Sequence, residues 1–438
     1  MRSHAFNQVC FQTFSYPETQ RPLLSTYKDL GGYKSWKSIV KDKLHPDEII
    51  KNVKDSGLRG RGGAGFPTGL KWSFMPKGSN KQHYIVCNSD ESEPGTCHDR
   101  EILRYNPHAV IEGIAIAGYA IGATVGYNYI RGEFLGEPIH NFDKALQDAY
   151  EAGLLGKNIM GSGIDFDLFS FVGAGAYICG EETALLESLE GKQGKPRFKP
   201  PFPANYGLYG KPTTINNTQS LASVPSIVLN GPDWFKNLGY GDNDGTAIFS
   251  VSGHVNNPGN YELPIGIPFR DLLEIAGGVK DGKQLKAVIP GGSSVPALTA
   301  SEIIDLNMDF DSLKKAGSAF GTGAVIIMDE DTCMVEVLKR ISRFYFAESC
   351  GQCTPCREGT GWMYRLICKM LDGKASINDL DLLLDVANKI EGRTICAFGD
   401  ASAWPVQSFL KRFRPEFEAK INHFKEVLPR GKLESCQI

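Results

Sequence analysis

Residues 84–95 read YIVCNSDESEPG, an apolar run that turns acidic after Asn88, and this stretch decides the fold class. Four apolar residues in succession are typical of a strand that is buried on both faces, as in a parallel sheet. Open α/β sheets bind their ligands just beyond the carboxyl ends of such strands. We therefore expect a parallel-sheet domain whose ligand site includes residues 88–95.

The segments around this stretch alternate between helix and strand patterns. Residues 45–55, HPDEIIKNVKD, carry apolar side chains at helical spacing between charged ones. Further along the chain we expect helices over 109–121 and 142–151 and a strand over 126–130. Such alternation indicates helices packed against a mostly parallel sheet, and we assign residues 1–244 to this α/β domain, with an N-terminal extension.

The rest of the chain divides into two smaller units and a tail. After residue 244, short strands with turn glycines and prolines are expected at 247–252, 259–263, 286–289 and 324–327. With one helix at 268–276, they predict a compact mixed domain over 245–332. Four segments at helical period predict a bundle over 333–425: 334–346, 359–371, 377–390 and 406–419. Residues 426–438 are expected to form a flexible tail.

The composition argues against several classes of protein. The chain has 438 residues and a formal net charge of -3, and its lysines and arginines form no basic stripe for nucleic-acid phosphates. Its most apolar stretch, residues 109–125, is interrupted by Glu112 and is shorter than the roughly 20 residues that span a bilayer. Residues 1–12 lack the apolar core of a secretory signal. We expect a cytoplasmic protein without direct membrane insertion or nucleic-acid binding.

Four of the eleven cysteines form one pattern near the C-terminus. Cys350, Cys353 and Cys356 are separated by two residues each, and Cys396 follows later. Three thiolates on one tight loop suit a cuboidal iron–sulfur cluster, whereas zinc sites more often use two separated Cys-x2-Cys pairs. We favour the iron–sulfur cluster and keep zinc as the alternative. The other seven cysteines lack ligand spacing and are expected to be buried thiols.

A glycine-rich loop precedes the buried strand. Residues 60–65, GRGGAG, satisfy G-x-G-x-x-G, but a helix precedes them where a dinucleotide-binding fold has a strand. The density of glycines, with Arg61 and Lys71 close by, suits close approach of the backbone to a phosphate or a planar ring. A flexible turn is the alternative.

The acidic loop and two later segments offer groups for a nucleotide. Carboxylates of residues 88–95 would repel a phosphate, so we expect them to bind ribose hydroxyls, ring N–H groups or a carboxamide, which predicts a preference for NADH over NADPH. A solvated acidic turn is the alternative. Residues 173–183, GAGAYICGEET, place paired acids before a helix, and 196–203 carry basic and aromatic side chains. Asn216 and Asn217 offer amides suited to phosphate or flavin edges.

Together and in this order, these segments resemble the NADH-binding flavoprotein subunit of respiratory complex I, the F subunit of NADH-quinone oxidoreductase, and the resemblance runs from about residue 31 to residue 424. It implies a multidomain α/β protein with a Rossmann-like domain for FMN and NADH, a ubiquitin-like β-grasp domain of the SLBB type, and a helical bundle with one [4Fe–4S] cluster. The implied FMN contacts are Gly60, Arg61, Gly62, Gly63, Lys71, Asn88, Asp90, Ser92, Gly180, Glu181 and Asn217. The implied NADH contacts are Phe66, Phe74, Glu93, Tyr177, Glu182, Lys199 and Phe202. The implied cluster ligands are Cys350, Cys353, Cys356 and Cys396.

Two places depart from the family pattern. Gln219 stands where the family generally has a glutamate, so no acidic role is expected there. Cys97 and His98 stand where an aromatic residue and a lysine or histidine are typical. We expect Cys97 close to the flavin pocket, either as a redox thiol or, preferably, as a filler side chain.

The implied activity is hydride transfer from NADH to FMN, followed by single-electron transfer to the cluster and onward to quinone. Hydride transfer needs two rings held together in a dry slot and no obligatory acid or base, so we expect no catalytic triad. We assign Glu93 and Glu182 to orienting NADH. The resemblance implies a thioredoxin-like [2Fe–2S] partner and a larger multi-cluster Fe–S partner, on the cytoplasmic side of the inner membrane.

Two other functions share part of this pattern. A diaphorase subunit of a soluble NAD-linked hydrogenase or formate dehydrogenase carries the same motifs, but such subunits often have additional Fe–S modules at either end, which this sequence lacks. A non-catalytic scaffold would keep the cluster and lose the nucleotide site. The intact glycine and acidic loops argue against the scaffold.

Overall fold

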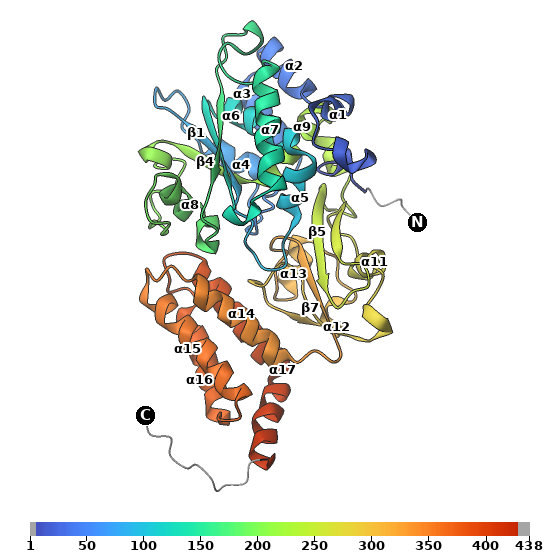
Figure 1. The fold of residues 1–438 in the computed structure, drawn as a ribbon, viewed down its shortest axis with the longest axis vertical. Helices are drawn as coiled ribbons and strands as arrows, with labels where there is room; N and C mark the ends of the chain where they lie inside the picture. Colours follow the sequence, from blue (N-terminus) through green and yellow to red (C-terminus); the bar gives the residue numbers. More distant parts are fainter. Residues whose placement is uncertain (1–5, 428–438) are drawn as a thin grey trace.

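A computed structural model describes residues 6–427 (Figure 1). Its N-terminal part contains a four-stranded parallel sheet with the strand order β3-β2-β1-β4. The strands are β1 (Tyr84–Ser89), β2 (Val125–Ile130), β3 (Asp167–Val172) and β4 (Thr213–Asn217). The register pairs Asn88 with Asn217, so the carboxyl ends of β1 and β4 lie side by side. The two predicted strands are confirmed, whereas β3 and β4 were not predicted.

Helices cover both faces of this sheet. They are α1 (Leu24–Asp29), α2 (Lys34–Asp42), α3 (Pro46–Asp55), α4 (Thr68–Ser73), α5 (His98–Tyr105), α6 (Pro107–Ala120), α7 (Glu137–Glu151), α8 (Glu182–Leu189), α9 (Thr218–Asn230) and α10 (Pro232–Lys236). Ile85 and Cys87 of β1 pack into the core with α6 and α9, while Val86 faces the opposite core with α8. Burial on both faces explains why this strand is continuously apolar.

Most of the apolar stretch at residues 109–125 forms the expected buried helix, α6, which ends at Ala120, and the one acidic residue in the stretch is hydrogen-bonded. Glu112 accepts hydrogen bonds from the Tyr27 hydroxyl at 2.6 Å and from the backbone amides of Tyr33 and Trp36 at 2.7 and 3.0 Å. A buried carboxylate costs free energy unless it is hydrogen-bonded in this way. Among residues 6–427, no helix combines the length and the apolar character needed to cross a membrane.

Residues 246–329, called here the second sheet unit, form a five-stranded sheet with the order β6-β5-β9-β7-β8. Its strands are β5 (Thr246–Gly253), β6 (Gly259–Pro264), β7 (Leu285–Ile289), β8 (Leu298–Thr299) and β9 (Ala324–Asp329), and its helices are α11 (Phe269–Ile275), α12 (Ala300–Ile303) and α13 (Phe310–Lys315). The first and last strands are parallel at the centre, and the other pairs are antiparallel. With α11 crossing between β6 and β7, this is the expected β-grasp topology.

The C-terminal helices form the expected bundle, which lies below both sheets in Figure 1. They are α14 (Met334–Glu348), α15 (Thr354–Leu371), α16 (Ile377–Ile390) and α17 (Phe398–Val427). The prediction started the last helix at residue 406, after Pro405, but α17 begins at Phe398 and continues through that proline; it bends at Phe413 instead. The tail expected over 426–438 lies outside the described residues, except for the two that end α17.

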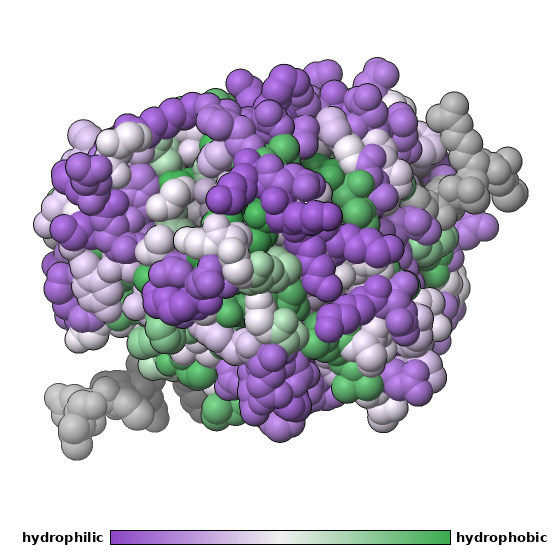
Figure 2. Space-filling view, turned by 90° about the horizontal axis from the view of Figure 1, so that it is seen from above, coloured by the Kyte–Doolittle hydropathy of each residue, from purple (hydrophilic) through white to green (hydrophobic). Residues whose placement is uncertain are grey.

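The three parts share cores and contacts. One hydrophobic core joins Leu185 of α8, Met328 of β9 and Leu338 of α14, so apolar packing continues through all three. The N-terminal segment is tied to the second sheet unit, because Glu262 accepts the backbone amides of residues 9–11. Seen from above, the surface is mostly hydrophilic, with apolar residues in small patches between charged ones (Figure 2).

Candidate functional site

Two cavities meet at the carboxyl ends of β1 and β4. The first has a volume of about 830 Å³ and lies between the glycine loop, α4 and β4. The second has a volume of about 580 Å³ and extends past the acidic loop to the second sheet unit and the start of α17. They share Gly62, Ala64, Asn88, Gly180 and Asn217. Together they form one continuous site, which exceeds the space that a single small ligand usually fills.

Every residue expected to contact FMN or NADH lines one of these cavities. The first is lined by Gly60, Phe66, Lys71, Phe74, Glu182, Lys199 and Phe202. The second is lined by Arg61, Gly63, Asp90, Ser92, Glu93, Tyr177 and Glu181. Both are lined by Gly62, Asn88, Gly180 and Asn217. Segments more than a hundred residues apart in sequence are thus brought into one site.

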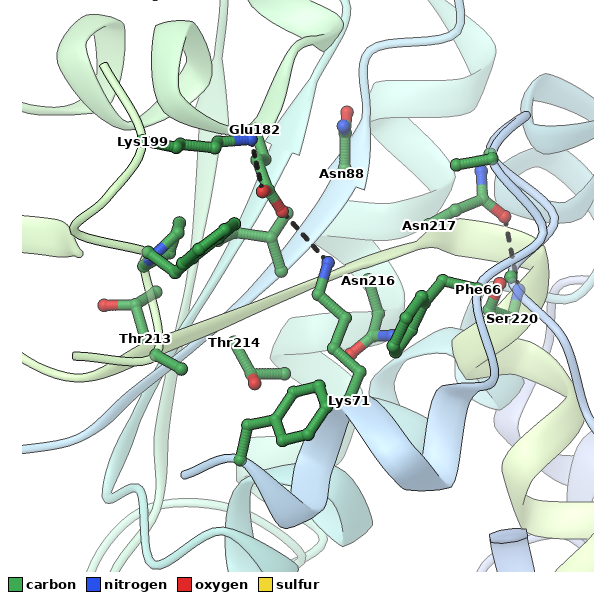
Figure 3. Close-up of a pocket in the computed structure, with 18 of the residues that line it drawn as sticks. Phe66, Lys71, Asn88, Glu182, Lys199, Thr213, Thr214, Asn216, Asn217 and Ser220 are labelled. Atoms are coloured by element: carbon green, nitrogen blue, oxygen red, sulfur yellow. Dashed lines mark hydrogen bonds and ion pairs between the residues drawn. The ribbon is translucent and has the colours of Figure 1, made fainter. Parts of the chain in front are cut away.

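A chain of ion pairs crosses the first cavity (Figure 3). Glu182 Oε2 lies 3.0 Å from Lys71 Nζ, and Glu182 Oε1 lies 2.7 Å from Lys199 Nζ. Burial by itself would raise the pKa of Glu182, but the two ammonium groups outweigh it and lower this pKa to about 2. The carboxylate is therefore ionised at neutral pH and holds both lysines inside the cavity.

Aromatic rings surround the mouth of the first cavity. Phe66, Phe74 and Phe202 are 42%, 54% and 55% exposed, and the centroids of the first two rings lie 6.0 Å apart. Grouped apolar rings that stay exposed typically mark a surface that a ligand or partner covers. A planar ring would stack on them.

The glycine loop shapes the site mainly with its backbone. A Cβ atom at Gly62 would lie 3.1 Å from Asn217 Cβ, so a side chain there would crowd β4. Arg61 directs its guanidinium away from a ligand, because it donates to the carbonyl oxygens of Arg59 and Thr246 at 2.5 and 2.8 Å. Arg61 therefore anchors the loop. Its guanidinium is held by these two hydrogen bonds and is not placed for a charged contact with FMN.

Asp90 presents a buried carboxylate to the second cavity. Its Oδ1 accepts a hydrogen bond of 3.4 Å from Ser92, but its Oδ2 finds no hydrogen-bond partner among residues 6–427. Burial, which Arg131 offsets only in part, raises the pKa of Asp90 to about 7. An unsatisfied carboxylate oxygen of this kind suits a hydroxyl donor, and FMN carries such hydroxyls on its ribityl chain.

Tyr177 and Glu93 form a half-buried, hydrogen-bonded pair rather than two free ligand contacts. The Tyr177 hydroxyl donates to Glu93 Oε2 at 2.7 Å, and its ring packs edge-on against Phe344, Tyr345 and Phe398 of the bundle. Burial raises the pKa of Glu93, although hydrogen bonds from Tyr177 and from the second sheet unit oppose this. The ring of Tyr177 is therefore occupied by packing, and its hydroxyl orients Glu93.

His98 is a buried residue near this pair that the sequence did not identify as a site residue. His98 Nδ1 lies 3.0 Å from Asp99 Oδ1, and His98 Nε2 lies 3.1 Å from the Thr322 carbonyl oxygen. Both partners are acceptors, so the ring must donate from both nitrogens and is an imidazolium. Burial lowers the pKa of His98, but the carboxylates of Asp99 and Glu91 raise it to about 9. The sequence signal that could have identified His98 was its position among acidic residues at the start of a helix.

Cys97 and Gln219, at which the sequence departs from the family pattern, both lie outside the two cavities. Cys97 is half-buried, and its thiol lies 3.5 Å from Asn260 Oδ1 in the second sheet unit, outside both cavities. Gln219 is buried at the start of α9 and also lies outside them, so neither residue touches the site. Of the other cysteines without ligand spacing, Cys10, Cys87 and Cys179 are buried, Cys333 and Cys368 are half-buried, and Cys436 lies outside the described residues.

The four predicted ligand cysteines converge on a pocket of their own. Cys350, Cys353 and Cys356 come from the loop before α15 and from its first turn, and Cys396 comes from the loop before α17. Gly351 has a φ of +72°, the left-handed conformation that lets this loop turn tightly. Four thiols around one small space suit a metal centre with thiolate ligands.

The cluster pocket and the second cavity share a wall. Ile178 and Phe398 line both of them, so a single layer of side chains separates the two spaces. A nucleotide site with a flavin-compatible cradle beside a four-cysteine pocket defines a class of protein, the iron–sulfur flavoproteins.

Comparisons with known proteins agree with this class. The family described as the Nuo51 FMN-binding domain matches residues 53–226, the NADH-ubiquinone oxidoreductase-F iron-sulfur binding region matches 336–420, and the SLBB domain matches 248–296. These matches fit the cradle of the second cavity, the four-cysteine pocket and the β-grasp sheet, and they favour a [4Fe–4S] cluster over zinc.

Relatives of known name narrow the class further. The Rickettsia bellii F subunit of NADH-quinone oxidoreductase is 57% identical over 400 residues, which cover 91% of this chain and 95% of that protein. The corresponding protein of Rickettsia typhi is 56% identical over 403 residues, which cover 92% of this chain and 95% of that protein. The chain belongs to the family of NADH-quinone oxidoreductase F subunits, whose members are parts of a larger assembly.

A solved hydrogenase structure supports the fold, and the share of it that this chain covers bears on the alternative of a hydrogenase diaphorase subunit. An NAD⁺-reducing [NiFe]-hydrogenase chain in the H2-reduced state has a TM-score of 0.81 and 35% identity, and the match covers 89% of this chain but 65% of that one. The air-oxidised form gives a TM-score of 0.78 and 63% coverage of its chain. This chain thus spans about two thirds of the hydrogenase chain, whereas it matches nearly the full length of the Rickettsia relatives.

Proposed function

We propose that this chain takes electrons from NADH and passes them singly through its cluster toward quinone, as the electron-entry subunit of an NADH-quinone oxidoreductase. FMN supplies the conversion from a two-electron donor to one-electron steps. The protein's own part is to bind the two nucleotides, hold their rings together and exclude water. No acid or base is needed for this, so we assign none.

Roles for the cavity residues follow from their positions. We assign FMN to the space bounded by the glycine loop, Asn88, Asp90, Ser92, Gly180, Glu181 and Asn217, with Lys71 at its edge. Asp90 Oδ2 is the acceptor for a hydroxyl donor, because it lacks a partner among the described residues. Backbone atoms of the glycine loop can approach the cofactor closely, since the loop lines both cavities with glycines that carry no side chain.

We assign NADH to the first cavity and its mouth. Phe66, Phe74 and Phe202 offer exposed rings for adenine. Glu182 accepts ribose hydroxyls and repels a 2′-phosphate, because its lowered pKa keeps it charged. Lys199 holds Glu182 in place, and Glu93, oriented by Tyr177, faces the second cavity where the nicotinamide end is expected.

The observation that carries this proposal is the wall shared by the nucleotide site and the cluster pocket. Ile178 and Phe398 are the side chains that belong to both. Electron transfer becomes slower with distance, so a single packed layer between the two sites favours transfer inside this chain. A scaffold without redox function would have no need for this proximity.

The onward path requires partners. We propose a thioredoxin-like [2Fe–2S] subunit and a larger multi-cluster Fe–S subunit, and a peripheral position on the cytoplasmic side of the inner membrane through the complex. These assignments rest on the family to which the chain belongs.

The proposal is tested on protein purified anaerobically with the subunits that remain bound to it. We expect about four irons and one FMN per chain in this flavoprotein, and bleaching of the flavin band when NADH is added. A colourless chain that binds zinc and ignores NADH would overturn the proposal. Normal cofactors with no response to NADH would support the scaffold.

A further inference from the structure

Residues 93–98, which begin in the acidic loop and end at the start of α5, are hydrogen-bonded to the second sheet unit at several positions. The contacts of Pro94 and Thr96 are a 3.3 Å bond from Ser293 N to the Pro94 carbonyl oxygen and a 2.6 Å hydroxyl pair between Thr96 and Thr322. Cys97 N donates to Ser250 Oγ at 3.2 Å, and Asn260 Nδ2 donates to the Cys97 carbonyl oxygen at 3.0 Å. Strand β1 delivers this loop, but a different sheet fixes its course.

Glu93 and His98, at the two ends of this segment, both line the second cavity. Glu93 Oε1 accepts the Ser294 backbone amide at 2.7 Å and the Ser293 hydroxyl at 3.2 Å. His98 donates to the Thr322 carbonyl oxygen at 3.1 Å. The orientation of both groups therefore depends on donors and acceptors outside the α/β domain that carries them.

The segment of residues 93–98 and the second sheet unit pack closely where each of them has a glycine. Gly292 has a φ of +96°, and a Cβ atom there would lie 2.6 Å from Glu93 Cγ. A Cβ atom at Gly95 would lie 3.0 Å from Ile326 in β9. Real Cβ atoms hardly ever come closer than 3.0 Å, so glycine at position 292 lets the Glu93 side chain lie against the second sheet unit, and glycine at position 95 lets the loop lie close to Ile326.

The attachment extends into the cluster-binding bundle. The Ser293 hydroxyl donates to Glu93 and lies 3.1 Å from the Tyr345 hydroxyl of α14, which is then the donor to Ser293. Three residues further along the same helix, Glu348 Oε2 accepts the Tyr177 backbone amide at 3.0 Å. Glu93 is thus held through Ser293 from α14, the helix that leads directly to Cys350.

We propose that the second sheet unit positions the Glu93 carboxylate in the nucleotide site, and that Ser293 is the positioning residue that does so together with the Ser294 amide. This SLBB-type unit then serves NADH oxidation by orienting a carboxylate that the α/β domain carries. The inference rests on the proposed function, because the effect of Glu93 is measured through NADH.

The test compares two serine variants in the assembled enzyme. Ser293→Ala removes a hydroxyl that donates to Glu93. Ser312→Ala is the matched control, because its hydroxyl donates to the carboxylate of Asp309 at 2.8 Å within the same unit and outside both cavities. Both are assayed for KM and kcat with NADH and ferricyanide, for FMN content and for Tm.

We expect Ser293→Ala to raise the KM for NADH by about three- to tenfold with a smaller change in kcat, since hydrogen bonds to charged groups are the stronger ones. Ser312→Ala should lower Tm by about as much as Ser293→Ala does and leave the KM for NADH unchanged. Equal KM values in the two variants, with normal wild-type NADH oxidation, would overturn the inference. A wild-type enzyme that does not oxidise NADH would instead refute the proposed function.

A second measurement guards against a general effect on folding. Tyr177→Phe removes the other hydroxyl that donates to Glu93. Because both hydroxyls act on one carboxylate, their effects on KM should depart from multiplicative by more than twofold in the double variant. Tyr177→Phe combined with Ser312→Ala should be multiplicative. Multiplicative effects in both pairs would contradict a shared action through Glu93.

Discussion

Replacing Glu182 by glutamine should relax the rejection of NADPH. Glu182→Gln keeps the shape of the side chain but removes the charge that pairs with Lys71 and Lys199 at 3.0 and 2.7 Å. Two unit charges 4 Å apart interact by about 4 kcal/mol at an effective dielectric constant of 20. Because the Glu182 side chain is 25% exposed, we take roughly a third to a half of this, about 1.4–2 kcal/mol. That corresponds to about a 10- to 30-fold gain for a 2′-phosphate.

The assay is the ratio of kcat/KM for NADPH to that for NADH, measured with ferricyanide. We expect this ratio to rise in Glu182→Gln, because the freed lysines can bind the phosphate, while the KM for NADH also rises. Glu190→Gln is the control: Glu190 lies at the other end of α8 and pairs with Arg197 and Lys192 at 2.9 and 2.6 Å, outside both cavities. An unchanged ratio and an unchanged KM in Glu182→Gln would refute this account of the site.

Further predictions concern the cluster and the buried histidine. Cys396→Ser should lose most of the bound iron and retain FMN, whereas Cys368→Ser in α15 should retain both; iron and flavin analysis checks this, and full iron in Cys396→Ser would contradict the ligand assignment. His98 has a folded-state pKa of about 9 against about 6.5 in an unfolded chain, so its stabilisation is complete below pH 6.5 and lost as the pH rises to 9. Urea unfolding should therefore show a decline of stability over this range, and His98→Gln should flatten it; an equal slope in both proteins would exclude the imidazolium.

The sequence predicted the parts of the fold that rest on local pattern. β1 was visible because burial on both faces makes it continuously apolar. β4 was missed because four of its five residues, TTINN, are polar, and these side chains make hydrogen bonds to distant residues, such as that from Trp72 Nε1 to Asn216 Oδ1 at 2.9 Å. The predicted start of the last helix at residue 406 was late, because α17 begins at Phe398 and accommodates Pro405 in its interior.

The residues expected at the site line two cavities that meet, and their contacts with FMN and NADH stay a prediction. The partners of these residues within the fold could not be predicted. The ion pair of Lys71 with Glu182 joins residues 111 positions apart, and no periodicity reports such a contact. The family resemblance implied an FMN contact for Arg61, and the sequence could not show that its guanidinium anchors the loop by hydrogen bonds to the carbonyl oxygens of Arg59 and Thr246.

The central claim, electron transfer from NADH to the cluster through the flavin of this chain, is tested most directly by comparing FMN-replete and FMN-depleted enzyme under anaerobic conditions. The cluster is monitored by electron paramagnetic resonance after NADH is added, and dithionite provides the control for an intact cluster. We predict a reduced-cluster signal with NADH only when FMN is present, and with dithionite in both samples. A signal of equal size from NADH in the depleted enzyme would contradict the account.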